Sequence, residues 1–312
     1  RATDVRPSTS TTATLCFAVV FSRRSGPSPP GGDSARVLGE LIALGAALAI
    51  AASAVFARSL AVFITARPLQ TMRAWVGAIF LFIAIPIIGK ADEVLAVPPH
   101  LIGLMAASAF LGVALGDTLY MRTLSMVTAS RSFPTVRGSQ ILSTLLVASL
   151  LFDEEVTWAT GLGALMILGG VYFAAFAGAR ARRRAPIEAV PVTKWIFLAL
   201  GAGLCWTSSF SFMKFVLLEV DAVVAQTFRL PIAALILTAM SVQAGEKNRL
   251  RVFDYKRKTL VSVIICGILS YGVGVVLELY AVKFAGMAKA AVLTSWTPLF
   301  ILFLSALFLH EK

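Results

Sequence analysis

Acidic side chains inside apolar segments are the first candidates for chemistry in this sequence. Asp117 lies about 16 residues into the apolar run that begins at Leu101, and Tyr120 follows it by about one helical turn. Glu278 lies in a second apolar run. Because a carboxyl group at membrane depth is costly, each is a candidate for binding a solute or carrying a coupled proton. The alternative for both is a helix end at which the carboxylate bonds a nearby basic side chain.

Three residues of one segment fall on a single helical face. Trp206, Ser209 and Met213 are spaced i, i+3 and i+7. This face could line a cavity in which Trp206 stacks on a solute. The alternative is a helix-packing face that carries an interfacial tryptophan.

Gln140 and Pro298 occupy nearly equivalent places in the two halves of the chain. Proline inside a membrane helix frees a carbonyl and bends the helix, so Pro298 and the neighbouring Trp296 predict a hinge or a binding site. A kink that only serves packing is the alternative.

The elements that must position these residues are apolar and long. The chain is 58% hydrophobic and 14% charged. About 20 helical residues cross a hydrocarbon core about 30 Å thick, and backbone groups in lipid must bond internally. The sequence therefore predicts an all-α integral membrane protein with helices at 38–57, 74–89, 101–121, 133–152, 157–178, 195–217, 222–243, 259–282 and 287–309.

The chain also repeats itself. The phrase QTMR at 70–73 returns as QTFR at 226–229, and ALGAALAIAASAVFAR at 43–58 returns as ALGAGLCWTSSFSFMK at 199–214, both 156 positions later. Five helices per unit is an odd number, so the second unit enters the membrane from the opposite side, as in many secondary transporters. The arginines that end the two phrases, Arg73 and Arg229, are interpreted as helix-end anchors, with gating contacts as the alternative.

These patterns predict four regions. Residues 1–37 are rich in Ser, Thr, Pro and Gly and are expected to be a disordered leader, with a non-native origin as the alternative. The first five-helix repeat covers 38–179, and a basic linker covers 180–194. The second repeat covers 195–312 and holds four helices, so we expect a tenth helix of about 25 residues to be missing from this sequence.

Several function classes are disfavoured by composition. The three cysteines and two histidines form no CxxC pair or metal-ligand cluster, and no phosphate-binding loop occurs, so neither a metal site nor a cofactor is expected. DxxxD, HxxxD and HExxH patterns are also missing, which argues against a membrane enzyme with catalytic residues. The formal charge of +12 comes from connections such as RARRR at 180–184, which favours contact with lipid over nucleic acid.

The chain resembles the EamA-type branch of the drug/metabolite transporter superfamily. The resemblance covers 38–312 and rests on GDTLYMRTL at 116–124, ASRSFP at 129–134, LLFDEEVTW at 150–158, LCWTSSFSFMK at 204–214 and TPLFILFLSALFLHE at 297–311. Three positions depart from the family pattern: Asp153 and Thr207 stand where glycine is usual, and Ile50 stands opposite Trp206. The resemblance implies ten helices in two inverted five-helix repeats, and export or exchange of small metabolites, amino acids or drugs.

The expected function is therefore a secondary transporter that works by alternating access, with a non-transporting membrane scaffold or regulator on the same fold as the alternative. Its expected partners are a small-molecule solute and membrane lipid, and association into a homodimer is left open. The expected location is the cytoplasmic membrane of a prokaryote. The basic connections place the N-terminus outside, whereas the family resemblance implies cytoplasmic termini. The candidate substrate-binding residues are Asp117, Tyr120, Gln140, Trp206, Ser209, Glu278, Trp296 and Pro298.

Overall fold

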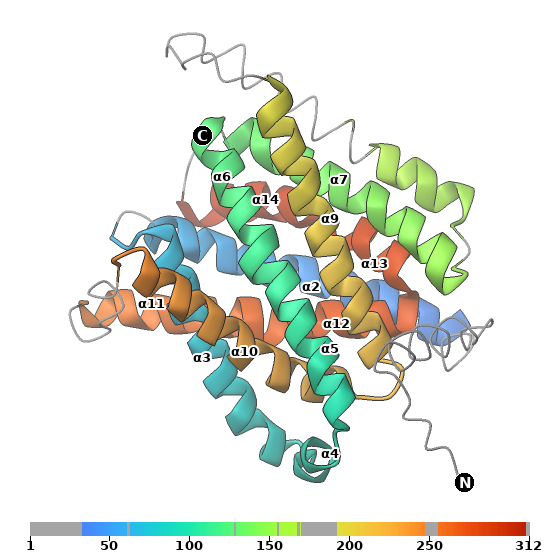
Figure 1. Cartoon of the computed structure of the whole chain (residues 1–312), viewed down its shortest axis with the longest axis horizontal. Helices are drawn as coiled ribbons and strands as arrows, with labels where there is room; N and C mark the ends of the chain where they lie inside the picture. The colour runs from blue at the N-terminus through green and yellow to red at the C-terminus, as the bar shows by residue number, and fades with distance from the viewer. Residues whose placement is uncertain are drawn as a thin grey trace, which may run out of the picture.

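A computed structural model describes residues 33–60, 63–127, 129–154, 156–166, 169, 192–246 and 255–309. All regular secondary structure in these residues is helical (Figure 1). The expectations for 1–32, for most of the linker and for the second half of the predicted helix 157–178 lie outside the described residues.

Among the residues that the structure describes, the first half of the chain forms four long rods and the short helix α4. The rod that holds Asp117 is continuous but contains a π-helical stretch, η1, between two α-helical segments. The elements are α2 (Asp33–Leu60), α3 (Ala66–Ile87), α4 (Ala91–Leu95), α5 (Pro99–Ala109), η1 (Phe110–Asp117), α6 (Thr118–Met126) and α7 (Ala129–Phe152).

The second half contains a similar series. Its third rod again holds a π-helical stretch, η4, and its fourth is divided at Ser295–Trp296, shortly before Pro298. The elements are α9 (Val192–Val216), α10 (Ala222–Gln243), α11 (Arg257–Gly267), η4 (Ile268–Gly274), α12 (Val275–Ala285), α13 (Met287–Thr294) and α14 (Thr297–Leu309).

Seven helical segments in the described part of the chain are long and apolar enough to cross a membrane: Ser34–Ala57, Arg67–Ile87, Pro99–Thr123, Thr135–Phe152, Thr193–Val216, Ala222–Gln243 and Arg257–Ala285. Large apolar side chains such as Phe82, Leu150 and Phe303 remain exposed on these helices and on α14. Exposed apolar surface on this scale suits contact with lipid.

The helices pack in pairs that join the two halves. The pairs α2 with α12, α7 with α9, and α3 with α10 have the most extensive contacts, and in Figure 1 α5 and α9 cross in front of α2 and α12. Four alanines of α2, Ala43, Ala46, Ala47 and Ala51, are fully buried. Small residues at these positions allow the helix backbones to approach closely.

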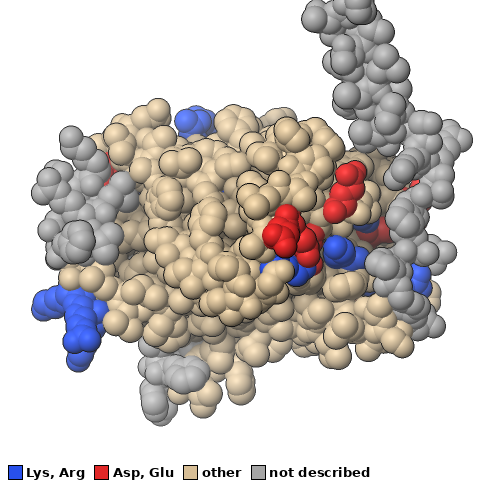
Figure 2. All heavy atoms as spheres, turned by 90° about the horizontal axis from the view of Figure 1, so that it is seen from below, with Lys and Arg blue, Asp and Glu red and all other residues tan. Residues whose placement is uncertain are grey.

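Polar contacts define two ends of the bundle. At one end, here called the Asp221 end, Lys90 pairs with Asp221 at 2.7 Å and the Lys283 ammonium donates to the Val220 carbonyl. At the other, the Glu246 end, Arg67 lies 3.9 Å from Glu246. Figure 2 shows the molecule from the side that carries α4: most of the surface is uncharged, and acidic and basic groups gather near one another.

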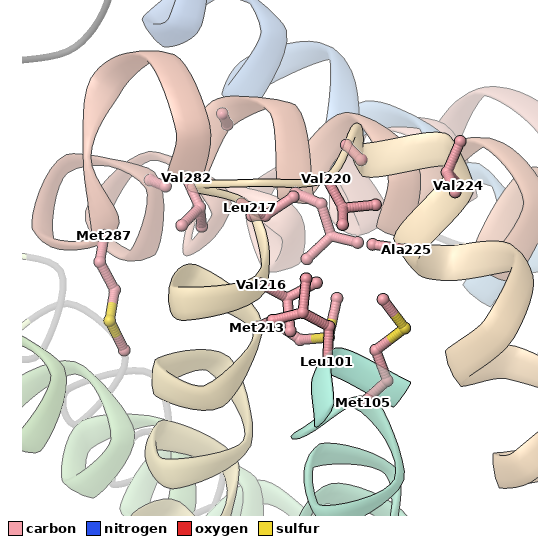
Figure 3. Packing of buried hydrophobic residues seen from close by; sticks show 14 of the residues in the cluster. Leu101, Met105, Met213, Val216, Leu217, Val220, Val224, Ala225, Val282 and Met287 are labelled. Atoms are coloured by element: carbon pink, nitrogen blue, oxygen red, sulfur yellow. The ribbon is translucent and has the colours of Figure 1, made fainter. Parts of the chain in front are cut away.

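The main hydrophobic core lies towards the Asp221 end. Figure 3 shows residues of α5, α9, α10, α12 and the turn between α9 and α10 meeting there, among them Met105, Met213, Leu217 and Val282. This core closes the bundle between its end and the polar groups at its centre.

Candidate solute site

The carboxylate of Asp117 is the centre of a polar cluster between α3, η1 and α9. Its Oδ1 accepts a hydrogen bond of 3.0 Å from the Trp206 indole nitrogen, and its Oδ2 accepts one from the Gln70 amide. Asp117 ends η1 and is half-buried. Both oxygens are therefore held in fixed directions by neighbouring helices.

A guanidinium group lies on the same side of α9. Arg229 donates to the hydroxyl of Ser108 at 3.0 Å and to that of Ser209 at 3.2 Å. The two serines also bond each other's backbone: the Ser108 hydroxyl donates to the Ser209 carbonyl at 2.9 Å, and the Ser209 hydroxyl donates to the Ser108 carbonyl at 2.7 Å. Arg229 is the eighth residue of α10 and interacts electrostatically with Asp117. Its interpretation as a helix-end anchor is wrong, because the sequence phrase lies inside the helix and not at its end.

Two glycines of η1 let α9 come this close. A Cβ at Gly112 would lie 2.7 Å from the Ser209 hydroxyl oxygen, and one at Gly116 would lie 2.6 Å from Cδ1 of the Trp206 ring. Such approaches are shorter than real Cβ contacts, so only glycine fits without a shift. The π-helical stretch and its glycines thus bring Asp117, Trp206 and Ser209 together.

A small cavity adjoins this cluster on the side of α7 and α12. Glu278, which is 9% exposed, and Arg137 both line it and interact electrostatically. Arg137 also donates to the Gln140 side-chain oxygen at 2.6 Å. The lining consists of Arg137, Gln140, Ile141, Thr144, Phe210, Glu278, Val282, Met287, Ala290, Ala291 and Thr294.

Trp206 connects the cluster with the surroundings of the cavity. The Arg137 guanidinium carbon lies 6.0 Å from the centre of the Trp206 ring, and the Tyr120 ring centre lies 5.6 Å from it at an angle of 54°. The indole therefore contacts an anion through its N–H and a cation through its face, which are the two electrostatic preferences of that ring.

Six of the eight candidate residues come together in this region: Asp117, Tyr120, Gln140, Trp206, Ser209 and Glu278. The other two lie apart. Trp296 is 44% exposed in the break between α13 and α14, and Pro298 is in the first turn of α14. The break itself agrees with the bend that proline was expected to cause.

Sequence reasoning did not select several residues of the region, chiefly Gln70, Ser108, Arg137, Arg229 and Thr294. The repeated Gln-Thr phrase contained two of them but was assigned to helix ends. Arg137 lies inside α7, within the predicted helix 133–152. The sequence did contain a signal for Arg137 and Arg229: placing an arginine inside an apolar membrane segment costs as much free energy as placing an acidic residue there.

Thr207 has a packing role next to the site. Its hydroxyl lies 2.7 Å from the Ser143 hydroxyl and 3.1 Å from that of Thr144, and it donates to the Gln140 carbonyl at 3.1 Å. These bonds join α9 to α7. These bonds explain why Thr207 carries a hydroxyl group at a position where the family resemblance leads us to expect glycine.

Comparison with known proteins agrees with the architecture. The model of the EamA-like transporter family matches residues 37–176 and 193–312, so the chain belongs to that family, whose members are membrane transporters, and is a multi-pass integral membrane protein. No curated protein matches the chain. Among 13 matching chains of solved structures is a crystal structure described only as that of a protein. It is 19% identical, has a TM-score of 0.70 and aligns over 89% of this chain and 90% of its own length, which is a likeness of fold.

Proposed function

We propose that this member of the EamA-like transporter family is a secondary transporter that moves a small organic solute across the membrane by alternating access. The solute binds at the Asp117–Trp206–Arg229 cluster and in the adjoining cavity. The observation that carries the proposal is the gathering of polar and charged side chains inside apolar helices, contributed by both halves of the chain.

The energetic argument concerns charge at membrane depth. Asp117, Glu278, Arg137 and Arg229 all lie within segments long enough to span the membrane. Ionisable residues in such segments are expensive and are found where they line a substrate path. Hydrogen bonds from Gln70, Ser108 and Ser209 reduce the cost, but packing alone would be met more simply by apolar residues.

The arrangement of the helices supports a ten-helix plan of two inverted five-helix repeats, over 38–179 and 195–312. The start of α3 and the end of α10 meet at the Glu246 end, while the end of α3 and the start of α10 meet at the Asp221 end. These two helices, which hold the equivalent phrases QTMR and QTFR, thus run in opposite directions. Transport folds of this kind bind substrate where the repeats meet.

Hydrogen bonds follow the same correspondence. The Ser108 hydroxyl donates to the Ser209 carbonyl. The equivalent residues are Cys266, 158 positions after Ser108, and Ser53, 156 positions before Ser209, and Cys266 donates to the Ser53 carbonyl at 3.2 Å. A Cβ at Gly116 would meet Trp206 at 2.6 Å, and one at its counterpart Gly274 would meet Ile50 at 2.8 Å. Both π-helical stretches also occupy equivalent places.

The proposed direction of transport is export or exchange. The proposed location is the membrane of a prokaryotic cell.

The test is metabolite profiling of cells and medium with and without the protein. We expect expression to change the distribution of one or a few solutes, and Asp117→Asn to remove this change. Asp92→Asn is the matched control, because Asp92 is an exposed acid of the short helix α4, outside the spanning segments. The amount of protein in the membrane is measured for each variant.

Two results would count against the proposal. If no solute responds to expression, a non-transporting scaffold on the same fold is favoured. If Asp117→Asn and Asp92→Asn leave the same solute distribution as the unaltered chain, transport stands but the assigned site does not.

A further inference from the structure

The short helix α13 forms one wall of the cavity. Four of its eight residues line it: Met287, Ala290, Ala291 and Thr294. In Figure 3 the Met287 side chain lies on the opposite side of α9 from Met105, at the edge of the main core. The position of α13 therefore decides whether the cavity is closed on this side.

Both ends of α13 are discontinuities of the backbone. Gly286 precedes it with φ = 90°, a conformation that side-chain-bearing residues rarely adopt. At the other end the helix stops at Ser295–Trp296, and Pro298 supplies no backbone N–H for continuing it. A short rod between two such points can turn as a unit, because hinge motions are absorbed by a few residues at element ends.

Two carboxylates contact the first turn of α13: Glu40 of α2 forms an ion pair with Lys289 at 2.7 Å, and Glu154 binds the end of the helix. Glu154 follows α7 in the chain, and its two oxygens accept hydrogen bonds from the Met287 and Ala288 N–H groups at 2.8 and 2.9 Å. These N–H groups have no partner inside their own helix, and the helix dipole favours a negative charge there. The absence of a side chain at Gly286 is needed for this contact, since a Cβ would lie 3.0 Å from the Glu154 carboxyl carbon.

A lysine from a third helix completes the contact. Lys214 of α9 forms an ion pair with Glu154, and its ammonium lies 4.2 Å from the centre of the Phe152 ring. The Lys214 side chain is only 14% exposed and the Glu154 side chain only 16% exposed. Removing one partner of such a pair leaves an uncompensated, largely desolvated charge, so the pair is strongly coupled.

We propose that Glu154 and Lys214 form a lock that holds α13 closed over the cavity, and that its release lets α13 turn about the 295–298 break and open the cavity towards the Asp221 end. The inference rests on the proposed transport function. It goes further in naming the moving wall, the residues that hold it and the side to which it opens.

The test measures access to the cavity and needs no knowledge of the solute. In a full-length chain with Cys16, Cys205 and Cys266 replaced by alanine, Ala291→Cys places a thiol in the lining. A charged, membrane-impermeant thiol reagent is applied to right-side-out and to inverted membrane vesicles. We expect Lys214→Met to raise the labelling rate about tenfold in one vesicle orientation only, and Lys214→Arg to label like the parent.

Two further variants separate the lock from general loosening. Glu154→Gln keeps an amide oxygen as acceptor but loses the charge, and we expect it to open the cavity at least as much as Lys214→Met. Lys90→Met is the control, because it removes an ion pair of 2.7 Å at the same end without touching α13. It is expected to leave the labelling rate unchanged.

The proposal is overturned if Lys214→Met and Glu154→Gln label at the parent rate in both orientations. It is also overturned if the two variants accelerate labelling equally in both vesicle orientations. A third contrary result is faster labelling of a reporter cysteine at Ala46→Cys, because Ala46 is buried in α2 and does not line the cavity. Failure of metabolite profiling would reject transport independently of these rates.

Discussion

Replacing Gly116 by alanine tests the geometry of the site with a single methyl group. The added Cβ would lie 2.6 Å from Cδ1 and 2.8 Å from the indole nitrogen of Trp206, where ordinary contacts begin at 3.4 Å. The ring must therefore retreat by about 0.8 Å (3.4 minus 2.6 Å), and its 3.0 Å hydrogen bond to Asp117 is disturbed.

The cost of this change follows from three contributions. Overpacking typically costs about 1–3 kcal/mol. The bond to a charged acceptor, worth about 1.5–3 kcal/mol, is weakened, and removing a helical glycine returns about 0.5–1 kcal/mol. We expect Gly116→Ala to lower the free energy of unfolding by about 1–3 kcal/mol by these magnitudes, and to reduce solute export.

Gly103→Ala is the matched control in the same rod. Gly103 is exposed and nothing lies within 4 Å of its added Cβ, so only the helix gain of about 0.5–1 kcal/mol remains. Thermal unfolding of both variants in detergent, followed by tryptophan fluorescence, should therefore show shifts of opposite sign. Equal shifts, or full export by Gly116→Ala, would show that Trp206 does not stand against η1 as described.

Three further outcomes are expected. Asp153→Gly should stabilise the protein by up to about 1 kcal/mol, because Asp153 has φ = 49° and glycine adopts this conformation without a Cβ penalty; a lower unfolding temperature would contradict this. Asp221→Ala should lower the free energy of unfolding by about 1–2 kcal/mol at pH 7, since Asp221 caps α10 through the Val223 N–H and accepts from Lys90 and Tyr280. Burial opposes ionisation of Asp221, but these hydrogen bonds and the Lys90 charge together lower its pKa below 3.8, so the stabilisation is present above about pH 4 and lost as the pH falls through the lowered pKa. The difference between the unaltered chain and Asp221→Ala, measured by denaturation from pH 7 to pH 3, should therefore shrink only below about pH 4, and a difference that vanished near pH 6 would argue against the ion pair.

The spanning helices were predictable because hydrocarbon permits few alternatives. A run of about 20 apolar residues must satisfy its own backbone, so its position can be found in the sequence without knowing its neighbours. The prediction 222–243 coincides with α10, and the prediction 259–282 falls inside the rod of α11, η4 and α12. The prediction 287–309 missed only the break at Ser295–Trp296, although Pro298 marked it.

Contacts between helices were not predictable in the same way. Glu154 directly follows α7 and its position suggests a role at the end of that helix, but it caps α13, which begins 133 residues later. Arg229 was assigned to a helix end because charge usually lies there, whereas two serines of other helices hold it inside. Such partners depend on how the rods cross, and a single sequence contains little information about crossing.

The departures from the repeat indicate where function resides in a duplicated scaffold. The correspondence that relates Ser108 to Cys266 and Gly116 to Gly274 keeps the packing of the two halves alike. It relates Asp117 to Val275, Glu278 to Tyr120 and Arg137 to Thr294, so these three charged groups have no charged equivalents, whereas Arg229 is matched by Arg73. Packing needs only complementary shapes, which a repeat supplies twice. A solute has no such symmetry, and a site that binds it in one orientation requires charges that the two halves do not share.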